Sequence, residues 1–371
     1  MKQQSQPQPY SPENPPMYHP NDEIDLRELF RAVWDGKLLI IVVTFLFSTC
    51  SIVFSLFAQE WWTSSATITA SQSQDLTLYQ QQVKQFQPIF NVYQDDGTVL
   101  ISNDLNNLVD SKLLFQGFID AFNSSNNKRA FLKQSAEFKD IILAEDSAMT
   151  EDSMRRLYSE WFEKINASLV DHRGIRSPYL VSFQSITKTS SFDMLVSYIS
   201  ATESIVYEDA FNNLNAAVNV KRNELIQQKK MLETQARNKL LVETERAKYA
   251  AQIARSAGVD KPIQTGNEKE LFSIDLGGKG LDAKVRALES VKNLSVIEPR
   301  LQQINAKLDM LKNLEIDRSV EFQTFRYLEN VEQPITRDKP KRALIVVLGT
   351  LLGGILGVAI VLVRFAFRKE D

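Results

Sequence analysis

The sequence predicts an α+β membrane protein in which two transmembrane helices bracket a periplasmic domain with a small membrane-proximal sheet and a long protruding helical hairpin. Three observations support this fold class. Two apolar runs lie near the ends of the 371-residue chain, and a long stretch between them lacks proline and glycine. Three short segments alternate apolar and polar residues, as half-buried strands do.

The first apolar run, Leu38 to Phe57, contains twenty consecutive residues without charge. As a helix it spans about 30 Å, the thickness of the hydrocarbon core of a bilayer. It is longer than the core of a cleaved secretory signal and follows a 37-residue leader, so we interpret it as an uncleaved anchor. Trp61 and Trp62 then fall at headgroup level, where aromatic residues are enriched.

The second run, Ala343 to Val363, holds 21 uncharged residues. Pro340 disfavours helix at the residue before it, so this span is expected to begin just after the proline. Inside it, Gly349, Gly353 and Gly357 recur every four residues. This spacing favours a face on which another helix approaches closely, although glycine is also generally common in membrane helices.

The positive charges predict the orientation. Four basic residues precede the first span, and the next Lys or Arg after it is Lys84, so the amino terminus is expected in the cytoplasm. Two spans return residues 364–371 to the same side, and in a bacterium the middle of the chain is then periplasmic. Basic residues just before the second span argue mildly against this, but long loops are translocated largely regardless of charge. The basic residues before the first span are Lys2, Arg27, Arg31 and Lys37.

Residues 1–37 form the predicted cytoplasmic tail. Residues 1–20 contain six of the twelve prolines, a composition that cannot bury a core and predicts a mobile segment. Residues 23–34 interleave apolar and charged side chains in an amphipathic pattern. We interpret this segment as a surface helix at the headgroups, with a partner-docking helix as the alternative.

Residues 58–190 form the predicted α/β base. Strands are expected at Trp62–Ala70 and Tyr179–Ile186, where apolar and polar residues alternate. Helical tendency covers 72–101, with breaks at Pro88 and at the turn Asp95-Asp96-Gly97. Helices are also expected over Asn103–Phe122, with Ser102 or Asp104 as the cap, and over Glu151–Leu169.

Residues 191–318 form the predicted hairpin. No proline or glycine occurs from about Ser191 to Ser256, and a helix of roughly 60 residues in this region would be on the order of 90 Å long. Its line of apolar residues is too thin for an isolated coiled coil and needs a neighbouring helix. Leu281–Leu314 supplies this second helical stretch, which is interrupted at Glu298-Pro299. The chain reverses direction between the two at the glycine-rich segment Leu276–Gly280. The nine basic residues between 221 and 255 are interpreted as a solvated face rather than a sugar- or phosphate-binding stripe. The seam residues, seven apart, are Phe211, Val218, Leu225 and Leu232.

Residues 319–342 contain a third predicted strand, Val320–Leu328, and the proline-containing segment that leads into the span. The first and third strands adjoin the two spans, so they are expected in one sheet. The predicted division of the chain is 1–37, 38–57, 58–190, 191–318, 319–342, 343–363 and 364–371.

The sequence offers no catalytic constellation. Its two histidines, His19 and His172, stand apart, and Cys50 lies inside the first span, so no metal-ligand spacing exists. The run Gly277–Gly280 lacks the spacing of a phosphate loop. A net charge of −3 over the chain gives no basic surface for nucleic acid. We therefore predict no enzyme, metal or cofactor, and no nucleic-acid partner.

One motif joins the second span to the segment before it. Pro334 is followed by four residues, then Lys339-Pro340-Lys341, then eleven residues, then Gly353-Gly354-Ile355-Leu356-Gly357. In this spacing the chain resembles the polysaccharide co-polymerase family, and within it the Wzz-type O-antigen chain-length determinants. The departures from the family's pattern are Val331 for proline, Lys339 for serine and Ile355 for methionine. Asp22–Phe30 and Trp62-Thr-Ser are also similar to the family.

The resemblance implies a non-enzymatic regulator of lipopolysaccharide O-antigen chain length. Such proteins form ring-like homo-oligomers in the inner membrane and act with the Wzy polymerase on a lipid-linked polysaccharide. From this we hypothesise that the glycine face packs against the first span or against the polymerase, and that the helical hairpins, gathered in the ring, influence when the growing chain is released. The missing cytoplasmic kinase domain sets the chain apart from relatives that carry one.

Three alternatives remain at this point. The regulated glycan can be another Wzy-dependent polymer, such as enterobacterial common antigen. A membrane-anchored periplasmic export adaptor also has long helical hairpins, but it usually has one anchor and lipoyl-like β domains, which the sequence does not predict. A chemoreceptor shares the order span, periplasmic helices, span, but it needs an output domain that residues 364–371 cannot provide.

Overall fold

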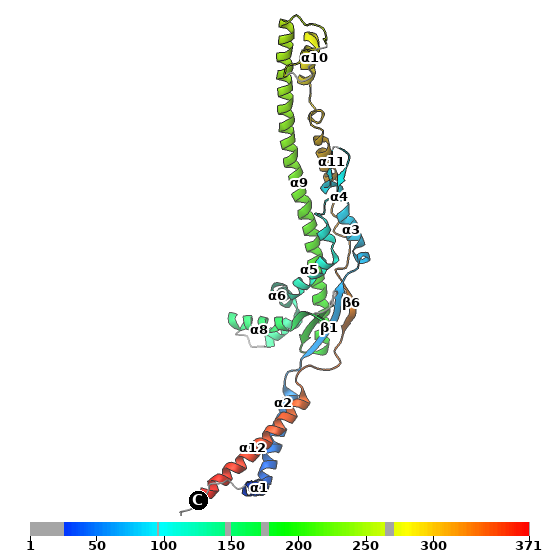
Figure 1. Cartoon of the computed structure of the whole chain (residues 1–371). Coiled ribbons are helices and arrows are strands. Elements are labelled where there is room, and N and C mark those ends of the chain that lie inside the picture. Colours follow the sequence, from blue (N-terminus) through cyan, green and yellow to red (C-terminus); the bar gives the residue numbers. More distant parts are fainter. Residues whose placement is uncertain (1–25, 95, 145–149, 172–177, 264–270, 371) are drawn as a thin grey trace, which may run out of the picture. The chain divides into compact units, whose positions relative to one another are not determined.

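The computed structural model describes residues 26–94, 96–144, 150–171, 178–263 and 271–370 (Figure 1). They form two compact units, one made of the residues up to Trp62 and from Ile335 onwards, the other of Thr63–Pro334. The predicted fold class is confirmed. Two long apolar helices flank, in sequence, a mostly helical domain with a small sheet and one very long helix.

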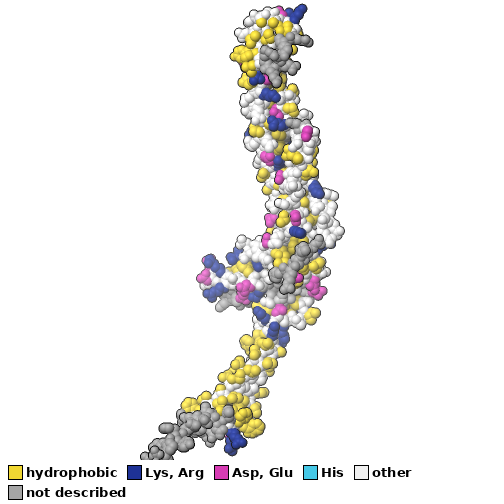
Figure 2. Space-filling view, in the orientation of Figure 1, with side chains coloured by type: hydrophobic (Ala, Val, Ile, Leu, Met, Phe, Trp, Pro, Cys, Tyr) yellow, Lys and Arg dark blue, Asp and Glu magenta, His cyan; other side chains and the backbone are white. Residues whose placement is uncertain are grey.

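The first unit contains helices α1 (Leu26–Asp35), α2 (Lys37–Phe57) and α12 (Arg342–Glu370). Helix α2 and the Arg342–Phe367 part of α12 have the length and composition of membrane spans. Hydrophobic side chains predominate on the visible surface of this part of the chain, with other uncharged side chains and backbone between them (Figure 2). Helix α12 begins two residues after Pro340, where the proline predicted its start.

The sheet of the second unit has the strand order β4-β5-β1-β6. Strands β1 and β6 are antiparallel, with Ala70 paired to Phe325, so the prediction that the strands next to the two spans share one sheet is confirmed. Strand β6 lies later in the chain than the predicted Val320–Leu328. The strands are β1 (Trp62–Ala70), β4 (Ile165–Leu169), β5 (Tyr179–Ser185) and β6 (Phe325–Glu332).

Strand β4 contradicts the predicted helix over Glu151–Leu169. Helix α8 (Glu151–Glu163) ends before it, and burial then alternates, with Ile165 and Ala167 inside and Asn166 and Ser168 exposed. That period of two is the signature of a strand, but it covers only five residues and directly follows a helical pattern. Pairing with β5 provides the backbone hydrogen-bond partners that make this segment a strand rather than a continuation of the helix.

Short elements link β1 to the long helix. The predicted cap of helix α5 was wrong, because Asp110 accepts the backbone N–H groups of Lys112 and Leu113 at 2.7 and 3.2 Å. Pro88 opens a short helix rather than breaking one, since its missing N–H costs nothing in the first turn. The elements are η1 (Ser73–Leu76), α3 (Thr77–Lys84), α4 (Gln87–Phe90), β2 (Val92–Tyr93), β3 (Val99–Leu100), η2 (Asn106–Val109), α5 (Ser111–Asn123), α6 (Ser125–Gln134) and α7 (Ala136–Ala144).

Helix α9 (Lys188–Ser256) runs unbroken for 69 residues, roughly 100 Å. The chain returns beside it as α10 (Gly277–Glu289), η3 (Leu294–Val296) and α11 (Arg300–Asn313) (Figure 1). All four predicted seam residues are buried, and Leu301, Ile304 and Leu311 of the return segment belong to the same core. The predicted helical hairpin is confirmed, with the neighbour that the thin seam required.

Two details of the hairpin differ from the prediction. Gly277–Gly280 forms the first turn of α10 rather than the reversal itself. Gly277 has φ +63°, and a Cβ there would lie 2.6 Å from the carbonyl carbon of Lys261, so this position needs glycine. The interruption of the return segment extends from Ser290 to Pro299, with η3 inside it, and is wider than the predicted dipeptide.

An ion pair ties the turn after β1 to strand β6. Arg326 Nε lies 2.5 Å from Asp75 Oδ2, and Arg326 Nη2 lies 2.7 Å from Asp75 Oδ1. Asp75 also accepts the backbone N–H of Gln72, which closes a capping box at η1. The hydrogen bond from Arg326 is the main reason that the pKa of Asp75 lies below its ordinary value of 3.8.

Replacing Asp75 with Asn should lower the free energy of unfolding by about 1.5–3 kcal/mol at pH 7, because a charged bidentate pair is lost. Since the pKa of Asp75 is lowered in the folded chain from its ordinary value of 3.8, the pair contributes fully only above about pH 5 and loses its contribution as the pH falls through the folded pKa. Unfolding of the full chain in detergent, followed from pH 7 to pH 3, measures this difference. Asp309→Asn, at an exposed pair with Lys312, is the control and should change little. An equal loss in both variants would contradict the assignment.

Candidate functional site

Helices α2 and α12 pack along their lengths through small and hydroxyl side chains. On α2, Thr44, Ser48, Ser51 and Ser55 follow one another at spacings of four, three and four residues, so they share one face of the helix. Ser55 is buried. This face meets the glycine face of α12, which allows the two backbones to approach closely.

Three glycines of α12, at 349, 353 and 357, lie so close to α2 that an added side chain would press on it. A Cβ at Gly349 would lie 2.6 Å from Ser51 Cβ, and one at Gly353 would lie 2.7 Å from Phe47 Cβ and 3.0 Å from Thr44 Cα. At Gly357 it would lie 3.0 Å from Ile40 Cα. Gly354 differs, because a Cβ there would meet only Thr44 Oγ1, at an ordinary distance of 3.8 Å. The three glycines spaced by four therefore set the separation of the two helices.

We call the contact between the glycine face of α12 and the hydroxyl-bearing face of α2 the α2–α12 seam. One hydroxyl contact joins the two helices within it. Thr350 Oγ1 lies 3.2 Å from Ser48 Oγ and 2.7 Å from the carbonyl oxygen of Val346. The carbonyl belongs to the preceding turn of α12, so the hydroxyl stays satisfied in an apolar environment. A polar contact of this kind adds specificity to a helix pair whose remaining surface is apolar.

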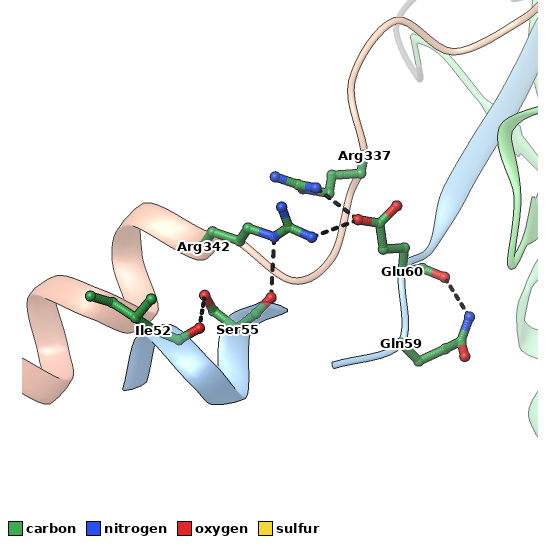
Figure 3. A network of polar contacts seen from close by, with 6 residues as sticks. All are labelled: Ile52, Ser55, Gln59, Glu60, Arg337 and Arg342. Atoms are coloured by element: carbon green, nitrogen blue, oxygen red, sulfur yellow. Dashed lines mark hydrogen bonds and ion pairs between the residues drawn. The ribbon is translucent and has the colours of Figure 1, made fainter. Parts of the chain in front are cut away.

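At the Phe57 end of α2, three charged residues form a cluster that we call the Glu60 clamp: Glu60, Arg337 and Arg342 (Figure 3). Glu60 Oε1 accepts from Arg337 Nη1 and from Arg342 Nη2, both at 2.8 Å. Arg342 Nε donates to the carbonyl oxygen of Ser55 at 3.1 Å. One carboxylate thus holds the segment before α12 and the first residue of α12 against the end of α2.

The positions of these charges follow from the helix ends. The last carbonyl groups of α2 have no partner within the helix, and a cation there is favourable. Arg342 supplies the cation at the end of α2. The carboxylate of Glu60 in turn lies beside the partial positive charge at the amino end of α12, where a negative charge is favourable. Two backbone hydrogen bonds extend the contact, from Trp61 N to the Lys339 oxygen at 3.0 Å and from Asp338 N to the Trp61 oxygen at 2.9 Å.

The motif residues divide between the seam and the clamp. Gly349, Gly353 and Gly357 lie against α2, with Gly354 beside them. In sequence, Pro340 and Lys341 lie between Arg337 and Arg342 of the clamp, and Pro334 comes two residues after the end of β6. Sequence reasoning did not identify Glu60, Arg337 or Arg342 as a cluster. The available signal was a lone carboxylate and two arginines, each within a few residues of a span.

The second unit has an open cleft of about 800 Å³ with an acidic lining. Burial raises the pKa of Glu203, and Tyr207 donates from its hydroxyl to the carbonyl oxygen of Val320 at 2.6 Å. Among the described residues, no group of three or more His, Cys, Asp or Glu side chains is placed to hold a metal. The lining residues are Asp75, Leu78, Glu203, Ser204, Tyr207, Glu208, Glu321, Phe322 and Gln323.

The fold and the seam define a chain anchored by two paired apolar helices, with its folded domain between them in sequence. Two family models match it. Residues 22–113 match the Wzz chain length determinant protein, and residues 300–366 match the G-rich domain on putative tyrosine kinase, GNVR. The predicted resemblance to the chain-length determinants is confirmed, and both matched segments include a span.

Curated relatives align over nearly the whole chain. The Ferric enterobactin transport protein FepE of Escherichia coli K12 is 25% identical, over 95% of this chain and 92% of its own. The Chain length determinant protein of Shigella dysenteriae is 24% identical, over 95% of this chain and 96% of its own. The ECA polysaccharide chain length modulation protein of E. coli K12 is also 24% identical, over 92% and 95%.

Solved structures share the fold. A full-length bacterial polysaccharide co-polymerase superposes with a TM-score of 0.61 at 23% identity, covering 94% of this chain and 99% of its own. The wild-type Shigella flexneri lipopolysaccharide O-antigen chain-length regulator WzzBSF gives a TM-score of 0.50 at 18% identity, covering 75% of this chain and all of its own. The architecture of spans, sheet and long helix is therefore that of the co-polymerases.

Replacing Gly353 with Ala should push α2 and α12 apart, because the new methyl group meets backbone and Cβ atoms of α2. A cysteine pair at Ser48 and Thr350, in a Cys50→Ser background, reports the approach of the helices. Its rate of disulfide formation should fall by roughly tenfold, which corresponds to about 1.4 kcal/mol. Gly354→Ala is the matched control and should stay within about twofold of the parent, since its methyl group finds space. Equal rates in the two variants would rule out the seam as described.

The Glu60 clamp should couple energetically across the two helices. In a double-mutant cycle, Glu60→Gln and Arg342→Gln should show a coupling of about 0.5–2 kcal/mol in the free energy of unfolding, since both groups are partly shielded from solvent. Unfolding of the full chain in detergent measures it. The same cycle on the exposed pair Glu151 and Arg155 should give a coupling close to zero. A zero value at the clamp as well would show that the cluster does not hold the helices together.

Proposed function

We propose that this chain is a non-enzymatic regulator of polysaccharide chain length in the bacterial inner membrane. The observation that carries the proposal is the match of residues 22–113 to the Wzz chain length determinant model. Chain-length proteins aligning over 92–95% of this chain support it, because the similarity includes both spans and the domain between them. The domain is periplasmic and both termini are cytoplasmic in this proposal, following the positive charges before α2.

The proposed partners are further copies of this chain, the Wzy polymerase and a lipid-linked polysaccharide. The chain sets how many repeat units the polymerase adds and forms no bond itself. The paired spans hold each copy in the membrane, and the hairpin of α9 and its return segment offers an elongated surface beside the growing glycan. O-antigen is the glycan that the motif favours.

The motif residues have a structural role in this proposal. Gly349, Gly353, Gly354 and Gly357 allow the close approach of α12 to α2, and the polymerase meets another face of the pair. Pro334, Pro340 and Lys341 shape the segment that carries Arg337 and Arg342 to Glu60. A fixed span pair transmits the position of the periplasmic domain to the membrane-embedded partner.

Two alternatives correspond to particular relatives. Enterobacterial common antigen stays an alternative glycan, because the ECA polysaccharide chain length modulation protein is 24% identical, as is the Chain length determinant protein. The second alternative is a role in transport, as in the name of the 25% identical Ferric enterobactin transport protein FepE. A deletion strain separates these possibilities, because it loses either a glycan length distribution or a transported solute.

Deletion of this chain should broaden the length distribution of one surface polysaccharide, seen as a loss of the modal bands on a gel. Restoring the chain should return the mode. Gly353→Leu combined with Gly357→Leu should shift or broaden the distribution, because large side chains at these positions cannot fit against α2.

The deletion strain and the glycine double variant test different parts of the proposal. Unchanged ladders of O-antigen and of enterobacterial common antigen in the deletion strain would contradict the proposed function. An unchanged ladder in the glycine double variant, at equal protein level, would contradict only the role of the seam.

A further inference from the structure

The short amphipathic helix α1 has an apolar side that the rest of the chain covers only in part. Leu29 and Val33 are half-buried, and α1 packs against α12. Phe30 and Trp34, one turn apart on the same side of α1, are 79 and 71% exposed. We call these two neighbouring side chains the α1 aromatic pair. Covering them would be favourable, because large aromatic side chains gain free energy on leaving water.

A close contact holds α1 at one end of the two spans. Gly36, between α1 and α2, lies against Val361 of α12, and a Cβ at Gly36 would be 2.5 Å from both Cγ atoms of Val361. The uncharged run of α2 begins two residues after Gly36, and that of α12 ends two residues after Val361. Since both apolar runs end beside this contact, α1 lies at the boundary between the hydrocarbon core and the headgroups.

Basic side chains border the α1 aromatic pair at the same level. Lys37 Nζ lies 5.3 Å from the centroid of the Trp34 ring. Arg31 of α1 and Arg364 of α12 are exposed. Lys and Arg side chains near the end of a span place their charged groups at the headgroups while their stems cover apolar surface. Aromatic rings next to such cations are typical of helices that lie in the plane of a membrane interface.

We propose that the α1 aromatic pair is a phospholipid-binding surface. The rings of Phe30 and Trp34 lie between the upper parts of the acyl chains, and Arg31 and Lys37 contact the lipid phosphates. The chain then has a third contact with the membrane besides its two spans. This inference needs only the spans and does not rest on the control of polysaccharide length.

The size of the surface favours lipid over a partner protein. The ten residues of α1 form a helix about 15 Å long, so a strip of one helix diameter along it covers roughly 150 Å². A specific protein interface buries about 800 Å² on each partner. Lipid needs no such area on α1, because the aromatic pair is continuous with the apolar surface that the spans already present to the bilayer.

Photo-crosslinking of the full-length chain in its native membrane tests the contact. A benzophenone amino acid in place of Phe30 or Trp34 should yield adducts with phospholipid, identified by mass spectrometry. The matched control is Asp35, which is exposed on the same helix about 100° from Trp34 around the axis and should yield far less of them. Equal lipid adducts at the three positions, no adducts, or mainly protein adducts at Phe30 and Trp34 would overturn the proposal.

Hydrogen exchange tests the same surface without a probe. The purified full chain is placed in vesicles of phosphatidylethanolamine and phosphatidylglycerol, and exchange of the α1 amides is followed. Phe30→Ser should speed this exchange by about tenfold or more, because the helix loses an aromatic ring that lipid covers. Ser and Phe have similar helix propensities, so a ring that stays in water would leave the exchange rate unchanged. An unchanged rate would therefore contradict the lipid contact.

The control variant is Asp35→Ser, which should keep the exchange rate within about twofold of the parent, since its side chain is exposed and the change in propensity is small. Equal acceleration in both variants would count against the aromatic pair. Protection of α1 in native membranes but not in the protein-free vesicles would assign the surface to a partner protein and overturn the lipid contact. A deletion strain with unchanged glycans would contradict the proposed function and leave these measurements unaffected.

Discussion

The close approach of α12 to α2 is the contact on which the anchored end of the molecule depends. Two apolar helices in lipid gain no hydrophobic energy from pairing, so packing and polar contacts must hold them together. The glycines at 349, 353 and 357 supply the packing, since a methyl group would overlap α2 at Gly349 and Gly353 and would make a tight contact with Ile40 at Gly357. The Glu60 clamp adds a charged contact where the helices leave the apolar region. The pair therefore has one register, because a shift along either helix would separate the glycines from their partners and Arg342 from Glu60.

In the second unit, the main structural requirement is to support a helix of 69 residues. No single compact core is long enough to cover it. The chain covers its first turns with the sheet and with aromatic side chains, where Tyr198 donates to the carbonyl oxygen of Phe122 at 2.7 Å. Farther along, the return segment supplies Leu301, Ile304 and Leu311 as a second layer. Support on one side only leaves the rest of the helix surface to water or to a partner.

The sequence predicted the spans, β1 and α9 because each rests on a property of one continuous segment: lack of charge, alternation, or lack of helix breakers. It did not predict β4, since five residues of alternation after a helix gain their meaning only from pairing with β5. The glycine spacing predicted a packing face but left its partner open between the first span and the polymerase, because periodicity identifies a face and not its occupant. The Glu60 clamp brings together residues almost 280 positions apart, and no local pattern indicates which carboxylate meets which arginine.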